Sequence, residues 1–139
     1  MQKLVIDTNV FISSLIQRSY PYLITTELFS NKEIHLCISD EVFEEYYDVL
    51  NREKFERFAD FITKSQTLLT NISRKATKYS PSFKVDLIKD AKDNKFLELS
   101  ETCKADFLIT GNTNDFTMKE YKGTLIVTPK QYWENYLIR

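Results

Sequence analysis

Glycine and proline are scarce in this chain, with two glycines and three prolines among 139 residues. Flexible linkers between domains depend on such residues, and no internal repeat or low-complexity segment divides the sequence. A chain of this length fits one domain and can bury roughly two-thirds of the surface that its unfolded form exposes. We therefore expect a single domain over residues 1–139, with a sizeable hydrophobic core.

Cysteine and histidine are also rare, and this excludes several kinds of catalytic and metal site. Cys37 and Cys103 each lie in an apolar stretch without metal-ligand spacing, so we predict buried, reduced thiols and neither a disulfide framework nor a zinc site. The single histidine, His35, lies within the apolar run 34–38 and is expected to be a partly buried structural residue. A ribonuclease mechanism with two imidazoles, or a serine or cysteine triad, is therefore disfavoured.

No hydrophobic run is long enough for a secretory signal or a membrane-spanning helix, because Asp7 interrupts the first apolar segment. We therefore expect a cytoplasmic protein without membrane contact. The 19 basic residues nearly balance the 20 acidic ones, so the chain has no overall positive field for nucleic acid. Charge is nevertheless uneven, since residues 52–78 contain seven basic and three acidic residues. Any binding to a phosphate backbone would use such a local patch.

Hydrophobic spacing predicts strands that alternate with helices. The expected strands cover residues 3–7, 34–38, 106–110 and 124–128, and the expected helices cover 10–18, 21–30, 40–52, 55–78, 91–104 and 129–138. This order favours an α/β fold of three layers, α/β/α, with a mostly parallel central sheet. Ligands of such sheets bind at the carboxyl ends of the strands, so we expect the site near the loops after residues 7, 38 and 110.

Asp7 follows an apolar strand and is the first candidate for chemistry. It precedes Thr8 and Asn9, small polar side chains that could hold a carboxylate or a coordinated water in place. An aspartate in this position is also a common turn former or helix N-cap, and the sequence leaves both roles open.

Two further acids are predicted near the buried faces of helices. Glu45 falls on the flank of helix 40–52, from which it could reach a crevice, or it is one more charge on a solvated face. Asp93 is expected to point inward, because mostly apolar side chains follow it three, four, seven and ten residues on. A buried carboxylate needs compensation by a cation, backbone amides or a helix N-terminus, so Asp93 is either a cation ligand or a helix-start residue. Asp90 fits a capping role.

The polar loop after strand 106–110 supplies the fourth acid, Asp115. Thr110 and Asn112 lie in the same segment, and the Asn112 amide could contribute an oxygen ligand or a hydrogen bond. Turn chemistry alone explains this loop about as well. Four carboxylates therefore recur at element boundaries, and their convergence on one spot would require a metal ion.

Four segments of the chain resemble the PIN domain and, within it, the VapC-like group of toxins from toxin–antitoxin systems. The matching segments are Val5–Val10, Glu45–Leu50, Asp90–Phe96 and Thr110–Phe116, with Val127–Pro129 closing the pattern. They follow one another in the order and at the spacing of that family, and they span nearly the whole chain.

The resemblance implies a parallel-sheet α/β/α fold and a ribonuclease that cuts single-stranded RNA with one or two Mg²⁺ or Mn²⁺ ions. The implied catalytic and metal-binding acids are Asp7, Glu45, Asp93 and Asp115, supported by Asn9, Thr110 and Asn112. An antitoxin protein as partner and a homodimer are further implications of the resemblance.

One departure from the family pattern keeps a second interpretation open. Many members of the group have Gly-Asp after this strand, whereas this chain has Gly111-Asn112 and an acid three residues later. The alternative is a PIN-like scaffold of weakened catalysis that binds RNA or a protein partner. Phosphoryl transfer through Asp7 as nucleophile is disfavoured, because the second aspartate usual in such hydrolases is replaced by Asn9.

Overall fold

Residues 1–138, which the computed structural model describes, form six strands and six α-helices. The strands are β1 (Gln2–Ile6), β2 (Ile34–Ile38), β3 (Thr77–Lys78), β4 (Phe107–Ile109), β5 (Glu120–Tyr121) and β6 (Thr124–Val127). The α-helices are α1 (Thr8–Ile16), α2 (Tyr20–Ser30), α3 (Asp40–Leu50), α4 (Phe61–Lys75), α5 (Asn94–Cys103) and α6 (Pro129–Gln131). Two 3₁₀ turns, η1 (Glu53–Phe55) and η2 (Ala91–Asp93), precede α4 and α5, and a π-helical segment, η3 (Tyr132–Tyr136), follows α6.

The strands form one sheet in the order β3-β2-β1-β4-β6-β5. All neighbours are parallel except β5 and β6, which form a hairpin at the edge. Lys122 and Gly123, with φ angles of 49° and 87°, make the two-residue turn of this hairpin. Positive φ at both positions suits the right-handed twist of the strands, and glycine adopts it without strain. The predicted mostly parallel sheet is therefore confirmed.

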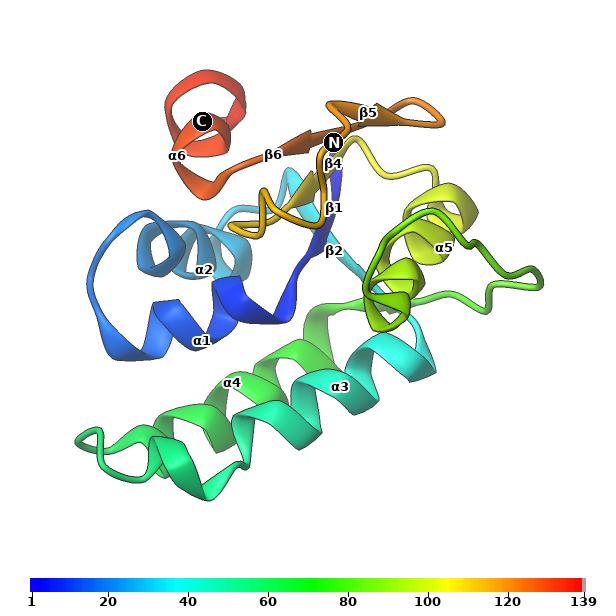
Figure 1. Ribbon diagram of the computed structural model, residues 1–139. Coiled ribbons are helices and arrows are strands. Elements are labelled where there is room, and N and C mark those ends of the chain that lie inside the picture. Colours follow the sequence, from blue (N-terminus) through cyan, green and yellow to red (C-terminus); the bar gives the residue numbers. More distant parts are fainter. Residues whose placement is uncertain (139) are drawn as a thin grey trace.

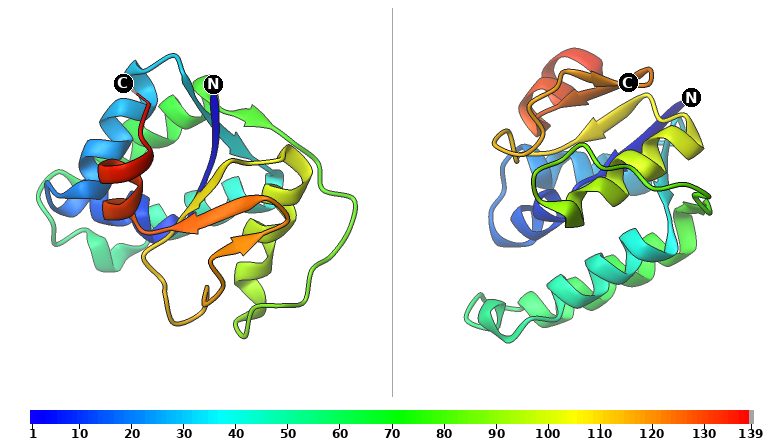
Figure 2. Two further views of the ribbon diagram at one scale, coloured as in Figure 1. Left: turned by 90° about the horizontal axis from the view of Figure 1, so that it is seen from above. Right: turned by 45° about the vertical axis from the view of Figure 1, so that its right-hand side comes forward.

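The helices cover both faces of the sheet, as the three-layer prediction required. In Figure 1, α1 and α2 lie on one side of the strands and α5 on the other, and the view from above in Figure 2 shows the same arrangement. The neighbouring helices α3 and α4 extend beneath the carboxyl ends of β1 and β2 (Figure 1). This placement puts the start of α1, the flank of α3 and the start of α5 around one edge of the sheet.

Helix α3 forms where the sequence predicted it, because its cap and its apolar stripe agree. The Ser39 hydroxyl accepts a hydrogen bond of 3.1 Å from the Val42 amide and so satisfies a free donor of the first turn. Val42, Tyr46 and Leu50 follow at intervals of four and are all buried. One face of α3 therefore anchors the helix to the core, and Glu45 is held at the edge of that face.

The prediction of one helix over 55–78 was wrong at both ends. Helix α4 begins only at Phe61, after a turn in which Asp60 adopts a left-handed φ of 58°. The spacing of Phe55 and Phe58 is that of a helix, but their rings pack against Phe61 at centroid distances of 5.0 and 6.5 Å. At the other end, Thr77 leaves the helix and pairs with β2 as the short strand β3.

The C-terminal prediction, one helix over 129–138, is also only partly correct. A capping box between Thr128 and Gln131 starts α6, and the backbone then widens, with the Leu137 amide bonding to the Tyr132 carbonyl at 3.0 Å. The Tyr132 hydroxyl donates to the Gln2 side chain at 2.6 Å and ties this segment to β1. Helical periodicity cannot predict such a hydrogen bond, because it joins residues far apart in the sequence.

The two-residue strands β3 and β5 were not predicted from the sequence, because they are too short to show an alternating pattern.

The rare residues lie in or beside the core. Cys37 and Cys103 are both buried and free, as predicted. His35 is partly buried, as expected, and is the register partner of Lys3 near the start of β1, whereas the acids lie near the end of that strand. No helix formed by residues 1–138 combines the length and the apolar character needed to cross a membrane.

Candidate metal centre

Asp7 stands where β1 ends and is 3% exposed. It occupies the N-cap position of α1, but its carboxylate makes no capping hydrogen bond. The carboxylate Oδ2 instead accepts a hydrogen bond of 2.6 Å from the Thr110 hydroxyl at the end of β4. The Asp7 amide also donates to the Ile109 carbonyl at 2.9 Å, which continues the pairing of the two strands. The sheet itself thus turns one oxygen of this buried carboxylate toward β4, and the backbone amides of Thr8 and Asn9 lie close enough to the carboxylate to lower its pKa.

Burial raises the pKa of Asp7, and the negative charge of Glu45 raises it further. The hydrogen bond from Thr110 opposes the rise but does not cancel it. Tyr46 forms the floor beneath, with its hydroxyl donating to the Ile6 carbonyl and its ring meeting Phe11 edge-on at 5.0 Å. Asp7 therefore lies between the packed core that contains Tyr46 and Phe11 and the neighbouring acid Glu45.

Glu45 does not lie on a solvated face, which settles one alternative that the sequence left open. Its side chain is 18% exposed and its Oε1 accepts from the Lys95 ammonium at 2.9 Å. Its Oε2 accepts from the Thr8 hydroxyl at the start of α1. Glu45 therefore connects α3 to both α1 and α5. Three other acids of α3 are exposed, as predicted: Glu41, Glu44 and Asp48.

Asp90, Asp93 and Asp115 come together most closely. Oxygen atoms from their three carboxylates lie within 4.8 Å of one another. Asp90 caps η2 by accepting from the Lys92 amide at 3.1 Å, so its predicted capping role is confirmed. Its place in the acidic cluster was missed in the sequence, although the spacing from Asp93 carried a signal. In a 3₁₀ turn residues three apart eclipse one another, and Asp90 and Asp93 are separated by that interval.

Asn112 holds Asp115 in place through two hydrogen bonds. The Asn112 Nδ2 donates to the Asp115 Oδ2 at 2.9 Å, and the Asp115 amide donates to the Asn112 Oδ1 at 3.3 Å. The backbone amide of Asn112 in turn donates to the Thr110 hydroxyl at 3.0 Å. The side chain of Asn112, which departs from the family pattern, is thus hydrogen-bonded within the loop and orients Asp115.

Burial, together with the crowding of carboxylates, raises the pKa of Asp93 to about 7. Burial contributes most, followed by the negative charge of Asp7 and a hydrogen bond with Asp115, with further repulsion from Asp90 and Glu45. Like charges at short range disfavour ionisation unless a cation compensates them. Carboxylate oxygens are the ligands preferred by hard divalent ions, so this donor set fits Mg²⁺ or Mn²⁺.

A cavity of about 400 Å³ opens over these acids. Its lining residues are Asp7, Thr8, Asn9, Ile12, Glu45, Val49, Arg52, Lys54, Phe55, Asp90, Lys92 and Asp93. We call this cavity the acidic crevice. Four of the lining residues are acids from three separate parts of the chain, and three are basic. Asn9 lies at its exposed edge, and Asp115 contacts Asp93 without belonging to the lining.

Comparison with known proteins gives three findings that agree with this geometry. The family model described as PIN domain matches residues 3–114. The uncharacterized protein MJ1680 of Methanocaldococcus jannaschii is 27% identical over 143 residues, covering 96% of this chain and 91% of that protein. A chain in the crystal structure of VapBC2 from Rickettsia felis, bound to a DNA fragment from their promoter, superposes with a TM-score of 0.55 at 15% identity. That match covers 91% of this chain and 98% of the other, and it shows a shared fold.

Proposed function

This chain belongs to the PIN domain family, and from that premise we propose that it is a metal-dependent endoribonuclease that hydrolyses phosphodiester bonds in single-stranded RNA. One observation carries the proposal. Asp90, Asp93 and Asp115 bring carboxylate oxygens within 4.8 Å of one another, and Asp7 and Glu45 lie in or beside the same acidic crevice. Carboxylates so close together disfavour one another's ionisation unless positive charge lies among them.

The ion that these acids suit is Mg²⁺ or Mn²⁺, one or two per molecule. Asp7 and Asp93 would hold the principal ion, Glu45 would complete its shell or orient a water, and Asp115 would serve a second ion or an outer shell. Asp90 is an additional oxygen donor within reach of Asp93. When bound, such an ion supplies an activated water and neutralises charge that develops on the phosphate.

Neutral side chains of this chain keep the acids in position. The Thr110 hydroxyl orients Asp7, and the Asn112 side chain orients Asp115. The Thr110 hydroxyl also accepts a hydrogen bond from the backbone amide of Asn112. Partners of this kind decide which carboxylate lone pairs face the crevice, and their loss commonly weakens metal binding or activity by about 10- to 100-fold. Thr110 and Asn112 therefore support the centre without ligating.

Basic residues that line the acidic crevice suit the RNA backbone. Arg52, Lys54 and Lys92 line the same cavity as the acids. The Lys54 ammonium lies 5.1 Å from the Phe55 ring centre, and the Phe61 ring stacks on Phe55 at 5.0 Å. The Phe55 ring thus has neighbours of its own, and we infer that these basic residues bind phosphates and that the Phe55 ring does not stack bases.

We also propose that the protein is the toxin of a toxin–antitoxin module. The order of its motifs resembles the VapC-like group, and its fold matches a chain of the VapBC2 complex. An antitoxin and a homodimer are the partners that follow from this proposal. Native mass spectrometry of the protein purified from the cells that produce it naturally would test both, and a monomer without a bound small protein would count against them.

The experiment that tests the nuclease proposal is cleavage of labelled single-stranded RNA in Mn²⁺, in Mg²⁺ and in EDTA. Wild type is expected to cleave only with a divalent ion, and Asp7→Asn and Asp93→Asn are expected to abolish cleavage. Asp48→Asn, which removes an exposed acid outside the acidic crevice, serves as the matched control and should cleave like wild type.

The same assay discriminates the alternative of a binding scaffold. RNA binding without cleavage under every metal condition would favour a scaffold of weakened catalysis. Cleavage that persists in EDTA, or in both aspartate variants, would refute the proposed metal centre.

A further inference from the structure

Lys95, at the start of α5, places a positive charge directly against one of the acids of the proposed centre. Its ammonium lies 2.9 Å from the Glu45 Oε1, and the two side chains are 20% and 18% exposed. The second oxygen of Glu45 is bound by the Thr8 hydroxyl. Both oxygens of this carboxylate are therefore occupied by the protein's own donors, one of which is charged.

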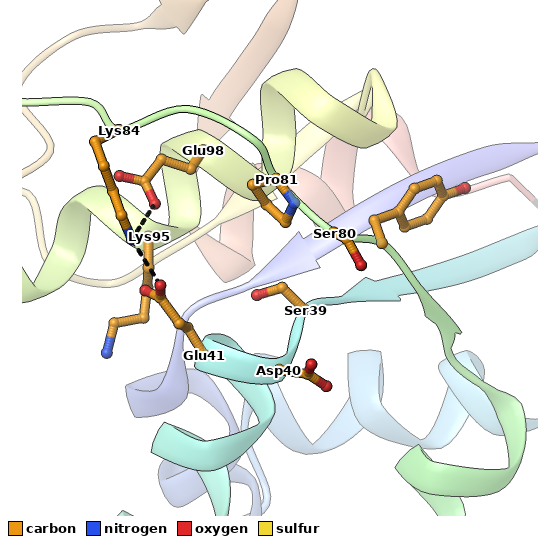
Figure 3. A pocket seen from close by; sticks show the side chains of 9 residues that line it. Ser39, Asp40, Glu41, Ser80, Pro81, Lys84, Lys95 and Glu98 are labelled. Atoms are coloured by element: carbon orange, nitrogen blue, oxygen red, sulfur yellow. Dashed lines mark hydrogen bonds and ion pairs between the residues drawn. The ribbon is translucent and has the colours of Figure 1, made fainter.

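The neighbouring acids do not share Lys95, because another lysine serves them. A second cavity has a volume of about 190 Å³. Figure 3 shows Lys84 in it, between Glu41 and Glu98. Its ammonium is 2.7 Å from Glu41 and 4.0 Å from the buried Glu98. The other oxygen of Glu98 accepts from the Val85 amide at 2.9 Å.

In the same view the stem of Lys95 runs along this second cavity and its ammonium points away from Glu41 and Glu98 (Figure 3). The acids on that side are therefore matched by Lys84, and the charge of Lys95 is committed to Glu45. Both partners of this ion pair are only partly exposed, so each side chain has limited access to solvent and the pair favours one geometry.

From this arrangement we propose that Lys95 is a positioning residue that holds Glu45 in the metal-free protein and competes with a divalent cation for that carboxylate. The inference rests on the proposed metal-dependent function. A fixed positive charge about 6 Å from a divalent ion weakens its binding about ten-fold even at the dielectric constant of water. Lys95 thus limits how tightly the acidic crevice binds metal and keeps Glu45 oriented before the metal arrives.

The test is Mn²⁺ binding to the RNA-free protein, measured by electron paramagnetic resonance of the free hexaaqua ion. Lys95→Gln is expected to lower the Kd for Mn²⁺ about ten-fold, because the competing charge is gone and Glu45 is released. Lys95→Arg keeps the charge and is expected to bind Mn²⁺ like wild type. Lys32→Gln is the matched control, because Lys32 is exposed, precedes β2 at the opposite end of that strand from the acids, and does not line the acidic crevice. Its effect should stay below about three-fold, since exposed charges are screened.

Each outcome decides the inference. Circular dichroism and thermal unfolding in EDTA establish which variants are folded, and Lys95→Met, which preserves the packing of the stem, replaces Lys95→Gln if the latter does not fold. An unchanged or higher Kd in the folded neutral variants, or a tighter Kd in Lys95→Arg, would overturn the role of Lys95 alone. No Mn²⁺ binding by wild type and all variants would overturn the proposed metal-dependent function as well.

Discussion

Replacing Asp93 with asparagine is expected to stabilise the metal-free protein, although Asp93 is a proposed metal ligand. Its carboxylate is partly buried and faces Asp7, Glu45, Asp90 and Asp115, and burial, together with this crowding, raises its pKa to about 7. Asparagine has nearly the same shape but carries no charge. A gain in stability on removing a polar group from a functional site would show that the site is strained without its ion.

The magnitude follows from the raised pKa of Asp93. The gap between the ordinary value of 3.8 and about 7 corresponds to about 4 kcal/mol for a fully buried group, at about 1.4 kcal/mol per pH unit. Asp93 is only partly buried, so solvent screens the repulsion and we expect about 1–2 kcal/mol. For a protein of this size that equals a rise of about 3–7 °C in Tm.

The pH dependence has a definite sign. Because the folded state of wild type binds the Asp93 proton more tightly than the unfolded state, stability from this group is greatest below pH 4. It is lost as the pH rises from about 4 to about 7, and above pH 7 the whole penalty is present. The variant lacks this titration, so its advantage over wild type should grow from pH 5 to pH 8.

Urea unfolding in EDTA at pH 5 and pH 8 measures the effect. Asp93→Asn should exceed wild type by about 1–2 kcal/mol at pH 8 and by a smaller amount at pH 5. Addition of Mn²⁺ should reverse the order, because only wild type keeps the full set of ligands. Asp48→Asn controls for the loss of one negative charge and should change the free energy of unfolding by less than about 0.5 kcal/mol. A variant no more stable than wild type at pH 8, or equally stabilised at both pH values, would refute the crowding argument.

Two further substitutions test how the acids are held. Thr110→Val removes the hydroxyl that donates to the buried Asp7 carboxylate, so urea unfolding should show a loss of about 1–3 kcal/mol in the free energy of unfolding. Thr110→Ser keeps a hydroxyl and should keep most of the stability. Equal stability of the two variants would argue against this hydrogen bond. Asn112→Asp exchanges the donor to Asp115 for a sixth negative charge, so the metal-free protein should lose about 1 kcal/mol or more, and Mn²⁺ should raise its Tm by more than it raises that of wild type. A Tm of this variant that does not depend on Mn²⁺ would contradict the proposed centre.

Much of the fold was predictable because its signals are local. The apolar runs of β1, β2 and β4 and the stripe of α3 are periodic over a few residues, and they led to the mostly parallel sheet that the structure shows. The ends of those elements are local as well, so Asp7 and Asp115 could be assigned to the carboxyl edge of the sheet. The start of α4 was not predictable from spacing. Phe55 and Phe58 are spaced as in a helix, but their positions depend on ring contacts with Phe61.

The sequence by itself determined which acids stand at the ends of strands and helices, since hydrophobic periodicity defines those ends. Only the tertiary structure decided how the acids relate to one another. It placed Asp90 against Asp115, gave Glu45 the Lys95 ammonium, and turned the Asn112 amide onto Asp115. The reason is physical: the distance between side chains 25 or 50 residues apart in sequence depends on how β1, α3 and α5 pack. Packing is a property of the whole core, and no local pattern in the chain contains it.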